Sequence, residues 1–224
     1  MDIQKLKSSI GYEFKESLYI KKALTHSSAH HESTGLDYER LEFLGDRIVN
    51  LIVADLLFKT FKDEKEGALA KRHTALVRTE TLAEIAKELN LGDFVILSDA
   101  ERKAGGSEND NILADLTEAV TAAIYLDGGF IEAERFFANA LGDRLHKMAE
   151  PPRDSKTALQ EWSQAHNLGL PIYEVTGQSG PDHAPEFTVE VTLSGQMPQR
   201  ATSTSKKRAE KEAAQAMLDV VIET

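Results

Sequence analysis

The sequence predicts an all-α domain over residues 1–148, joined to a small α+β domain of α-β-β-β-α order over residues 154–224. Three observations predict this division. In the first part, apolar residues recur every three to four positions, which is the period of a helix. In the second part, two segments alternate apolar and polar residues with the period of a strand. Between them, "AEPPRDS" contains consecutive prolines, which cannot continue a helix, so residues 149–153 are predicted to form a linker.

The elements of the first domain follow from apolar periodicity and from glycine-containing turns. "KEG", "KAGGSEND" and "LDGGF" supply the turns. The helical pattern is strongest in four stretches, at residues 41–58, 76–90, 111–126 and 131–148.

The second domain begins with an amphipathic helix, "SKTALQEWSQAHN", and ends with another, "SKKRAEKEAAQAMLDVVI". Between them, "IYEVTGQ" and "PEFTVEVTLSG" read as strands. In the second of these strands one face is apolar and is expected to be buried, and it consists of Phe187, Val189, Val191 and Leu193. The other face is polar, with Thr188, Glu190 and Thr192.

The composition is ordinary for a soluble globular protein, with 41% hydrophobic and 28% charged residues among 224. No segment approaches the roughly 20 apolar residues of a membrane span, and the start, "MDIQKLKSSIGYEF", has no apolar run. We therefore expect no membrane association and a cytoplasmic location. The chain has no cysteine, which excludes disulfides and leaves carboxylates and seven histidines as the strong metal ligands.

Two predicted helices carry carboxylates on faces that are otherwise apolar. Glu39, Glu42 and Asp46 share one side of the helix at residues 38–57, and that side continues as core valines. In "NILADLTEAVTAAIYLDG", Asp115 and Glu118 share a face that continues as alanines. Small residues let two helices approach to about 8 Å, which would bring four of these carboxylates together.

Such a cluster needs protons or cations, because two unit charges about 4 Å apart repel by roughly 4 kcal/mol at the effective dielectric of a protein. Oxygen ligands without His or Cys select Mg²⁺, Mn²⁺ or Ca²⁺. A Mg²⁺ site of this kind indicates hydrolysis of a phosphate ester or anhydride. At this point the alternative stays open that both faces are solvated, with Arg40 and Arg47 as ordinary ion-pair partners.

The net charge of −11 argues against a polyanionic partner, since most nucleic-acid-binding proteins have a basic surface. However, four basic residues fall within six positions, namely Lys206, Lys207, Arg208 and Lys211. With Ser205 as N-cap, the first two lie where helix N–H groups already favour an anion. Together with the turn "GPDHAPEF" and the polar helix face in "KTALQEWSQ", this pattern suits recognition of a double helix by its shape, although a solvated basic face would look the same.

The sequence resembles the bacterial ribonuclease III family. "ERLEFLGD" resembles the signature octapeptide of that family at every position, and "ILADLTEAVTAAIYLDGG" resembles the family's second carboxylate helix. "THSS", "EG" at residues 66–67 and "LVRTETLA" also agree in kind and order. From Asp154 onward the chain resembles the double-stranded-RNA-binding domain, through "KTALQEW", "GPDH" and "SKKRAEKEAA".

The resemblance implies roles for individual residues. The implied metal ligands are Glu42, Asp46, Asp115 and Glu118, of which Asp46 and Glu118 would also be catalytic. Glu39 and Glu66 match auxiliary acidic positions near the dimer interface and the substrate. The implied RNA contacts are Thr157, Gln160, Glu161, Gln164, Pro181, His183, Ser205, Lys206 and Lys207.

The implied activity is Mg²⁺-dependent hydrolysis of both strands of double-stranded RNA, which leaves 5′-phosphate and 3′-hydroxyl ends. Mn²⁺ would replace Mg²⁺, and no small-molecule cofactor is expected. The family acts as a homodimer through its nuclease domains, in the processing of ribosomal RNA precursors and other structured transcripts. Two other classes of protein remain as alternatives. One is a helical Mg²⁺-dependent nucleotide pyrophosphohydrolase, although such an enzyme needs no duplex-binding domain. The other is an RNA-binding protein without catalysis, although such a protein need not retain four metal ligands.

Overall fold

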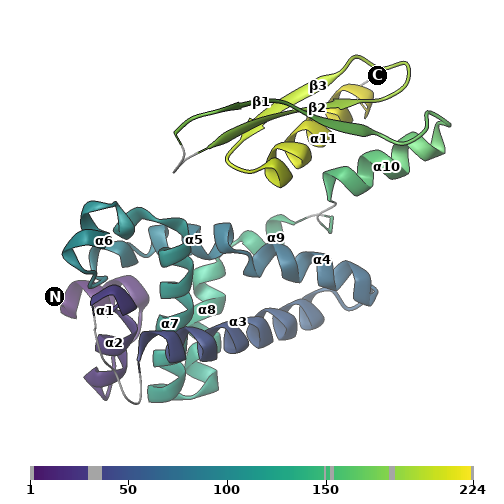
Figure 1. Cartoon of the computed structure of the whole chain (residues 1–224). Coiled ribbons are helices and arrows are strands. Elements are labelled where there is room, and N and C mark those ends of the chain that lie inside the picture. Colours follow the sequence, from purple (N-terminus) through teal and green to yellow (C-terminus); the bar gives the residue numbers. More distant parts are fainter. Residues whose placement is uncertain (1–2, 30–36, 149, 152–153, 182–184, 223–224) are drawn as a thin grey trace. The chain divides into compact units, whose positions relative to one another are not determined.

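The computed structural model describes residues 3–29, 37–148, 150–151, 154–181 and 185–222. The chain divides into two compact units, Met1–Pro152 and Arg153–Thr224, drawn from purple to green and from green to yellow in Figure 1. The first unit is helical, and the second has a three-stranded sheet with two helices, which confirms the predicted fold class. Of the predicted linker, residues 149, 152 and 153 lie outside the described part of the chain.

The first unit contains nine α-helices in its described residues, connected by short turns and 3₁₀ segments. Their bounds are α1 (Ile3–Ile10), α2 (Ser17–Ala23), α3 (Tyr38–Thr60), α4 (Glu66–Val77), α5 (Thr79–Glu88), α6 (Asp99–Lys103), α7 (Asp110–Gly128), α8 (Phe130–Leu141) and α9 (Arg144–Lys147). The 3₁₀ segments are η1 (Ser27–Ala29), η2 (Leu91–Asp93) and η3 (Gly106–Glu108).

Helix α7 is the centre of the first unit, and α2, α3, α5 and α8 pack around it (Figure 1). It is alanine-rich, and Ala119, Ala122 and Ala123 have no exposed surface. Small side chains allow neighbouring helices to approach closely on several sides. The long helix α3 is capped by Asp37, whose carboxylate accepts a hydrogen bond from the backbone N–H of Arg40.

The helical pattern predicted over residues 76–90 is interrupted in the structure at Arg78. Its backbone is extended, with φ −69° and ψ 154°, so α4 ends at Val77 and α5 begins at Thr79. The hydroxyl of Thr81 donates a hydrogen bond of 2.8 Å to the backbone carbonyl of Ala75, which links the two helices across this break.

A buried arginine fastens the end of the first unit to α4. Arg72 is 1% exposed, and its guanidinium donates to both carboxylate oxygens of Glu64 at 2.9 and 2.6 Å and to the backbone carbonyl of Met148 at 2.5 Å. The guanidinium carbon also lies 3.8 Å from the ring centre of Phe61. Because the buried charge has a carboxylate partner and hydrogen bonds, its desolvation is compensated.

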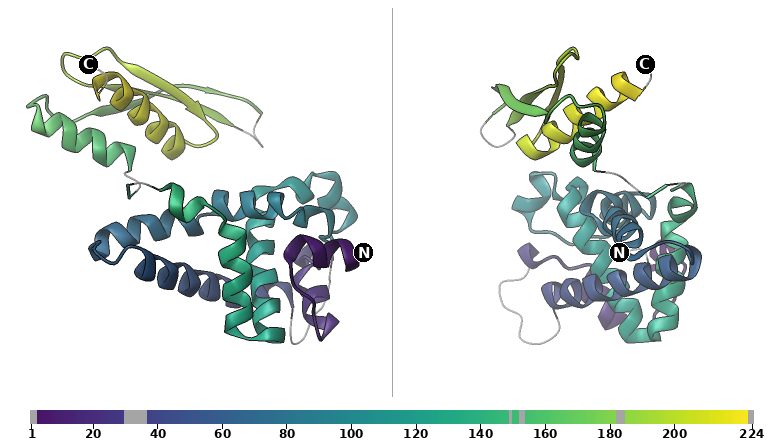
Figure 2. Two further views of the ribbon diagram at one scale, coloured as in Figure 1. Left: turned by 180° about the vertical axis from the view of Figure 1, so that it is seen from behind. Right: turned by 90° about the vertical axis from the view of Figure 1, so that its right-hand side faces the viewer.

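The second unit consists of α10 (Ser155–Ala165), β1 (Ile172–Ser179), β2 (Glu186–Thr192), β3 (Gln199–Ser203) and α11 (Lys206–Ile222). The strands form an antiparallel sheet in the order β1-β2-β3, with an irregularity between Val175 and Gly177. Both helices cover the same face of the sheet (Figure 2). The apolar face predicted for residues 187–193 is confirmed at Val189, Val191 and Leu193, which are buried, whereas Phe187 is only partly buried.

None of the helices in the described residues combines the length and the apolar character needed to cross a membrane.

Candidate metal centre and nucleic-acid interface

The candidate metal centre lies where α3 crosses α7. Gly45 on α3 faces the backbone of Glu118 on α7 so closely that a Cβ at Gly45 would overlap the Glu118 carbonyl group and lie 2.9 Å from its Cα. Only glycine permits this approach. The crossing therefore places the residues that flank Gly45 next to the carboxylates of α7.

Three of the four predicted metal ligands meet at this crossing. Glu42, Asp115 and Glu118 each offer a carboxylate oxygen, and the three oxygens lie within 4.8 Å of one another. All three side chains are partly buried. The cluster contains neither His nor Cys, so its donor set fits a hard divalent cation such as Mg²⁺ or Mn²⁺.

Burial and mutual repulsion raise the pKa values of these carboxyls. The pKa of Glu118 is raised from 4.5 to about 8, first by burial and then by the charges of Asp115 and Glu42, while Arg47 acts in the opposite direction. Burial also raises the pKa of Asp115 and, together with the charges of Asp115 and Glu39, that of Glu42. Without a cation, the site is thus under electrostatic strain.

The fourth predicted ligand, Asp46, is held by neighbours on its own helix. Its Oδ1 accepts a hydrogen bond of 2.8 Å from the side-chain amide of Asn50, and its Oδ2 forms an ion pair with Arg47. In this arrangement Asp46 is not one of the three residues whose oxygens converge. The sequence prediction that four carboxylates cluster is therefore matched by three of them in the structure.

The two auxiliary acidic residues are exposed and stand outside the cluster. Glu39 lies in the first turn of α3, and its charge contributes to the raised pKa of Glu42. Glu66 is the first residue of α4.

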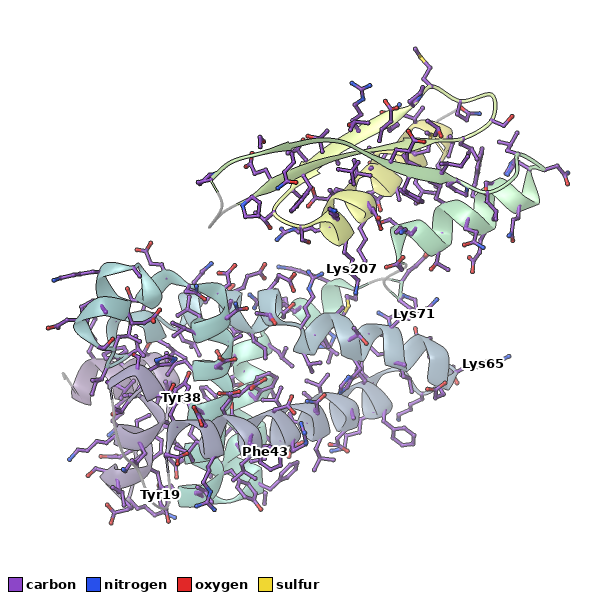
Figure 3. All side chains as sticks on the ribbon, viewed as in Figure 1. Tyr19, Tyr38, Phe43, Lys65, Lys71 and Lys207 are labelled. Carbon is purple, nitrogen blue, oxygen red and sulfur yellow. The ribbon has the colours of Figure 1, made fainter. Side chains whose placement is uncertain are left out.

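Tyr38 and His26 also border the carboxylates, and the sequence argument did not assign either to the site. Tyr38, labelled in Figure 3, is buried with 3% of its surface exposed, and its pKa is raised by burial and by the charges of Asp115, Glu42 and Glu118. The His26 ring packs edge-on against Tyr38, with 5.1 Å between ring centres, and its proximity partly offsets the rise in the pKa of Asp115.

The orientation of the His26 ring is fixed by Ser28, whose backbone N–H donates to its Nδ1 at 3.1 Å. The ring thus comes from the "THSS" segment, and Tyr38 directly precedes the octapeptide. Their positions in or beside these motifs are the sequence features that could have assigned His26 and Tyr38 to the site.

The predicted RNA contacts of the second unit lie on exposed surfaces. The four residues expected from α10 are all exposed, as are Pro181, Ser205, Lys206 and Lys207; the α10 residues are Thr157, Gln160, Glu161 and Gln164. His183 lies outside the described residues. The predicted capping by Ser205 is confirmed, because its hydroxyl accepts a hydrogen bond of 3.3 Å from the backbone N–H of Arg208.

Among the described residues of the second unit, the basic side chains that lack a carboxylate partner stand at the start of α11. Four basic side chains pair with carboxylates, as Lys156–Glu210, Arg200–Glu190, Arg208–Glu212 and Lys211–Asp154. Lys206 and Lys207 form no such pair with any residue that the structure describes, and Lys207 is labelled in Figure 3. They stand at the helix N-terminus, where backbone N–H groups also favour an anion.

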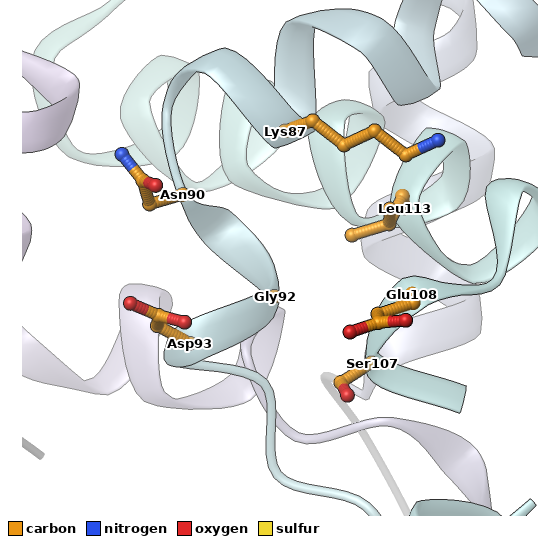
Figure 4. A pocket seen from close by; sticks show the side chains of 7 residues that line it. All are labelled: Lys87, Asn90, Gly92, Asp93, Ser107, Glu108 and Leu113. Carbon is orange, nitrogen blue, oxygen red and sulfur yellow. The ribbon is translucent and has the colours of Figure 1, made fainter. Parts of the chain in front are cut away.

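A pocket of about 440 Å³ lies elsewhere on the first unit (Figure 4). Its charged side chains are largely paired, with Lys87 bound to Asp110 at 2.6 Å and Asp93 bound to Lys5 at 3.2 Å. It contains none of the predicted metal ligands, and it is lined by Lys87, Asn90, Gly92, Asp93, Ser107, Glu108 and Leu113.

Comparison with known proteins assigns a family to each unit. Residues 16–145 match the model of the family described as Ribonuclease-III-like, and residues 155–221 match that of the double-stranded RNA binding motif. The nuclease domain of the ribonuclease III of Campylobacter jejuni superposes with a TM-score of 0.60 at 40% identity, over 65% of this chain and 99% of that one. Fold and comparison together define the class, a helical nuclease domain followed by a double-stranded-RNA-binding domain.

Two relatives match this chain along most of their own length. "Ribonuclease 3" of Ehrlichia ruminantium (strain Gardel) is 46% identical over 210 residues, which cover 93% of this chain and 92% of the relative. "Ribonuclease 3" of Wolbachia sp. subsp. Brugia malayi (strain TRS) is 44% identical over 215 residues, which cover 95% and 88%. The chain belongs to the ribonuclease III family.

Proposed function

We propose that this chain cleaves double-stranded RNA at a divalent-metal centre built on Glu42, Asp46, Asp115 and Glu118. Family membership makes it an endoribonuclease that acts on double-stranded RNA. The observation that carries the assignment of the centre is the convergence of Glu42, Asp115 and Glu118 within 4.8 Å, inside an otherwise apolar helix crossing. Residues 1–148 are the nuclease domain in this proposal, 149–153 the linker and 154–224 the RNA-binding domain.

The donor set supports Mg²⁺, with Mn²⁺ as a substitute, because carboxylates alone offer hard oxygen ligands. When bound, such an ion supplies an activated water and stabilises the charge that develops on the leaving 3′ oxygen. The chain itself holds the ligands in place and limits their access to bulk water. Asp46 follows Gly45, which contacts the Glu118 backbone, so the side chains of Asp46 and Glu118 both start from the helix crossing and are assigned the catalytic roles.

The second domain supplies affinity for the duplex. Lys206 and Lys207 are exposed, lie at a helix N-terminus and are not neutralised by a described carboxylate. Such residues bind phosphates without reading bases, which suits recognition of a duplex by its shape. The exposed polar residues of α10, together with Pro181 and His183, are the proposed contacts to the minor groove.

The nuclease domain offers a surface for a second copy of the chain. Phe43, Leu51 and Phe58 are spaced along one side of α3 and are all more than half exposed. Figure 3 labels Phe43 on this helix. Large apolar side chains gathered on one surface mark interfaces. A solved Campylobacter jejuni nuclease domain is described as having a flexible region involved in dimer formation. We assign a homodimer with one metal centre in each subunit, and Glu39 and Glu66 near that interface.

In this proposal the enzyme works in the cytoplasm on precursors of ribosomal RNA and other structured transcripts. A nucleotide pyrophosphohydrolase does not account for the double-stranded RNA binding motif at residues 155–221. A binding protein without catalysis does not account for the cluster of partly buried carboxylates, since holding them together without a cation is costly.

The test of the metal centre is Asp115→Asn, with Asp110→Asn on the same helix as its matched control. Asp110 is exposed at the start of α7 and is paired with Lys87, away from the carboxylate cluster. We expect Asp115→Asn to abolish the heat of Mn²⁺ binding in calorimetry and to reduce cleavage by orders of magnitude, while a gel shift of duplex RNA is retained. Parental Mn²⁺ binding and cleavage in Asp115→Asn would contradict the assignment.

A further inference from the structure

Asn50 makes contacts that the metal-centre assignment does not use. Its side-chain nitrogen Nδ2 lies 2.8 Å from Asp46 Oδ1 and 2.6 Å from the Asp46 backbone carbonyl oxygen. An ionised carboxylate and a carbonyl group both only accept hydrogen bonds. The amide nitrogen must therefore be the atom that faces Asp46, and it gives one proton to each acceptor.

The backbone at Asn50 is itself tied to the neighbouring helix. Nε2 of His73, on α4, lies 3.1 Å from the Asn50 carbonyl oxygen, and because that oxygen can only accept, Nε2 carries the proton. Asn50 and Asp46 are one helical turn apart on α3, so the side-chain amide reaches the carboxylate without leaving the helix surface. A half-buried donor thus holds Asp46 from a fixed position.

The two oxygens of Asp46 have partners of different kinds. Oδ1 is bound by Asn50, whereas Oδ2 is paired with Arg47, whose side chain is 65% exposed. An exposed arginine pair contributes little and is readily exchanged, because water competes for both charges. A divalent cation can therefore replace Arg47 at Oδ2 while the hydrogen bond at Oδ1 stays in place.

We propose that Asn50 is a positioning residue for Asp46: its amide retains Oδ1 and leaves Oδ2 as the oxygen that joins the metal centre when the arginine is displaced. This inference rests on the proposed function, in which Asp46 is a metal ligand. Partners that hydrogen-bond to metal-binding carboxylates orient them, and their loss costs about 10- to 100-fold in metal affinity or activity.

The experiment compares Asn50→Leu and Asn50→Ala, which lack the donor, with Asn50→Gln, which keeps an amide one turn from Asp46. Asn139→Leu, an exposed asparagine on α8, controls for the same substitution on another helix of the unit. For each full-length variant, Mn²⁺ affinity is measured by calorimetry without RNA. The Mg²⁺ concentration for half-maximal cleavage, kcat and the KM for duplex RNA are measured alongside, with thermal unfolding as the check of folding.

We expect Asn50→Leu and Asn50→Ala to weaken Mn²⁺ affinity and raise the Mg²⁺ requirement by about tenfold, with the KM for RNA unchanged. Asn50→Gln and Asn139→Leu should stay near the parent. If both variants without the donor bind Mn²⁺ like the parent, or lose kcat with an unchanged Mg²⁺ requirement, Asn50 does not position Asp46. Asp46→Asn distinguishes a failure of this inference from a failure of the proposed function. If Asp46→Asn loses cleavage while the Asn50 variants behave like the parent, only the role of Asn50 is wrong. If Asp46→Asn cleaves like the parent, the assignment of Asp46 as a metal ligand is wrong as well.

Discussion

Replacing Glu118 by glutamine should stabilise the metal-free protein while it removes the activity. The pKa of Glu118 is raised from 4.5 to about 8, so the folded state binds a proton there more tightly than the unfolded chain does. The destabilisation is therefore small at acid pH, grows between about pH 4.5 and pH 8, and is complete above about pH 8, where Glu118 is ionised beside Asp115 and Glu42. Glutamine keeps the size of the side chain and never ionises.

The magnitude follows from that shift. At 1.36 kcal/mol for each pKa unit, a rise from 4.5 to about 8 sets an upper bound of about 5 kcal/mol. The side chain is partly solvated, and its neighbours share the same protons, so we expect about 2 kcal/mol to be measured. For a domain of this size that is a gain of roughly 4–8 °C in melting temperature.

The assay is thermal unfolding of parent and Glu118→Gln in EDTA at about pH 5 and about pH 9, with Glu108→Gln as an exposed control. The Glu118→Gln variant should melt above the parent only at the higher pH. Saturating Mg²⁺ should narrow or reverse the difference, because a ligand at about 100 times its Kd stabilises the parent by about 2.7 kcal/mol. In the same preparation, duplex RNA should still be bound and cleavage should fall by orders of magnitude. If Glu118→Gln melts below the parent at the higher pH in EDTA, or cleaves at the parental rate, Glu118 is not a strained ligand of the metal centre.

Three further predictions concern binding, assembly and packing. Lys206→Ala combined with Lys207→Ala should weaken the binding of RNA equally for different duplex sequences. It should also lower the slope of log affinity against log salt concentration by about one for each lost phosphate contact. If a filter-binding titration shows unchanged salt dependence, the two lysines do not contact phosphates. Phe58→Asp should convert the proposed dimer to a species of 24.7 kDa in light scattering, and a parent that is already a fully active monomer would contradict the proposed dimer. Gly45→Ala should destabilise the fold by roughly 1–3 kcal/mol and impair metal binding, because the methyl group meets backbone of α7. Gly67→Ala has open space around it and should be neutral or stabilising by up to about 1 kcal/mol in the same chemical denaturation, so equal effects of the two substitutions would contradict the close approach.

The fold and the centre of the site were predictable because they depend on periodic patterns. The spacing of Glu42 on one helix and of Asp115 and Glu118 on another fixes which faces carry carboxylates, and apolar neighbours fix that these faces turn inward. Gly45, within the octapeptide, is also visible in the sequence, although only the structure shows that its hydrogen atom faces the Glu118 backbone.

Other features depend on contacts between residues far apart in the chain, and no local pattern encodes them. His26 reaches the site because its segment is tied to residues 96–98 by the hydrogen bonds His26 N–H to Ile96 carbonyl and Ser98 N–H to Ser28 hydroxyl. Arg72 looks like a surface residue of an exposed helix, yet it is buried against Glu64 and the Met148 carbonyl.

The position of Asp46 was likewise not foreseen, since helical spacing gives the face of a side chain but not its rotamer or its partners. On spacing alone Asp46 lies with Glu42, whereas in the structure Asn50 and Arg47 hold its carboxylate. The sequence shows that Asn50 and Asp46 are one helical turn apart and could form a hydrogen bond, but it does not show whether the bond forms or which oxygen accepts it.

In the proposed function, this chain hydrolyses double-stranded RNA at the carboxylate centre with Mg²⁺. The most direct measurement incubates the purified chain with a long RNA duplex, with one of its strands alone and with the DNA duplex of the same sequence, each in Mg²⁺ and in EDTA. We predict cleavage of the RNA duplex in Mg²⁺ only, into fragments with 5′-phosphate and 3′-hydroxyl ends. Cleavage that persists in EDTA, or that is as fast on the single strand or on DNA, would contradict the account.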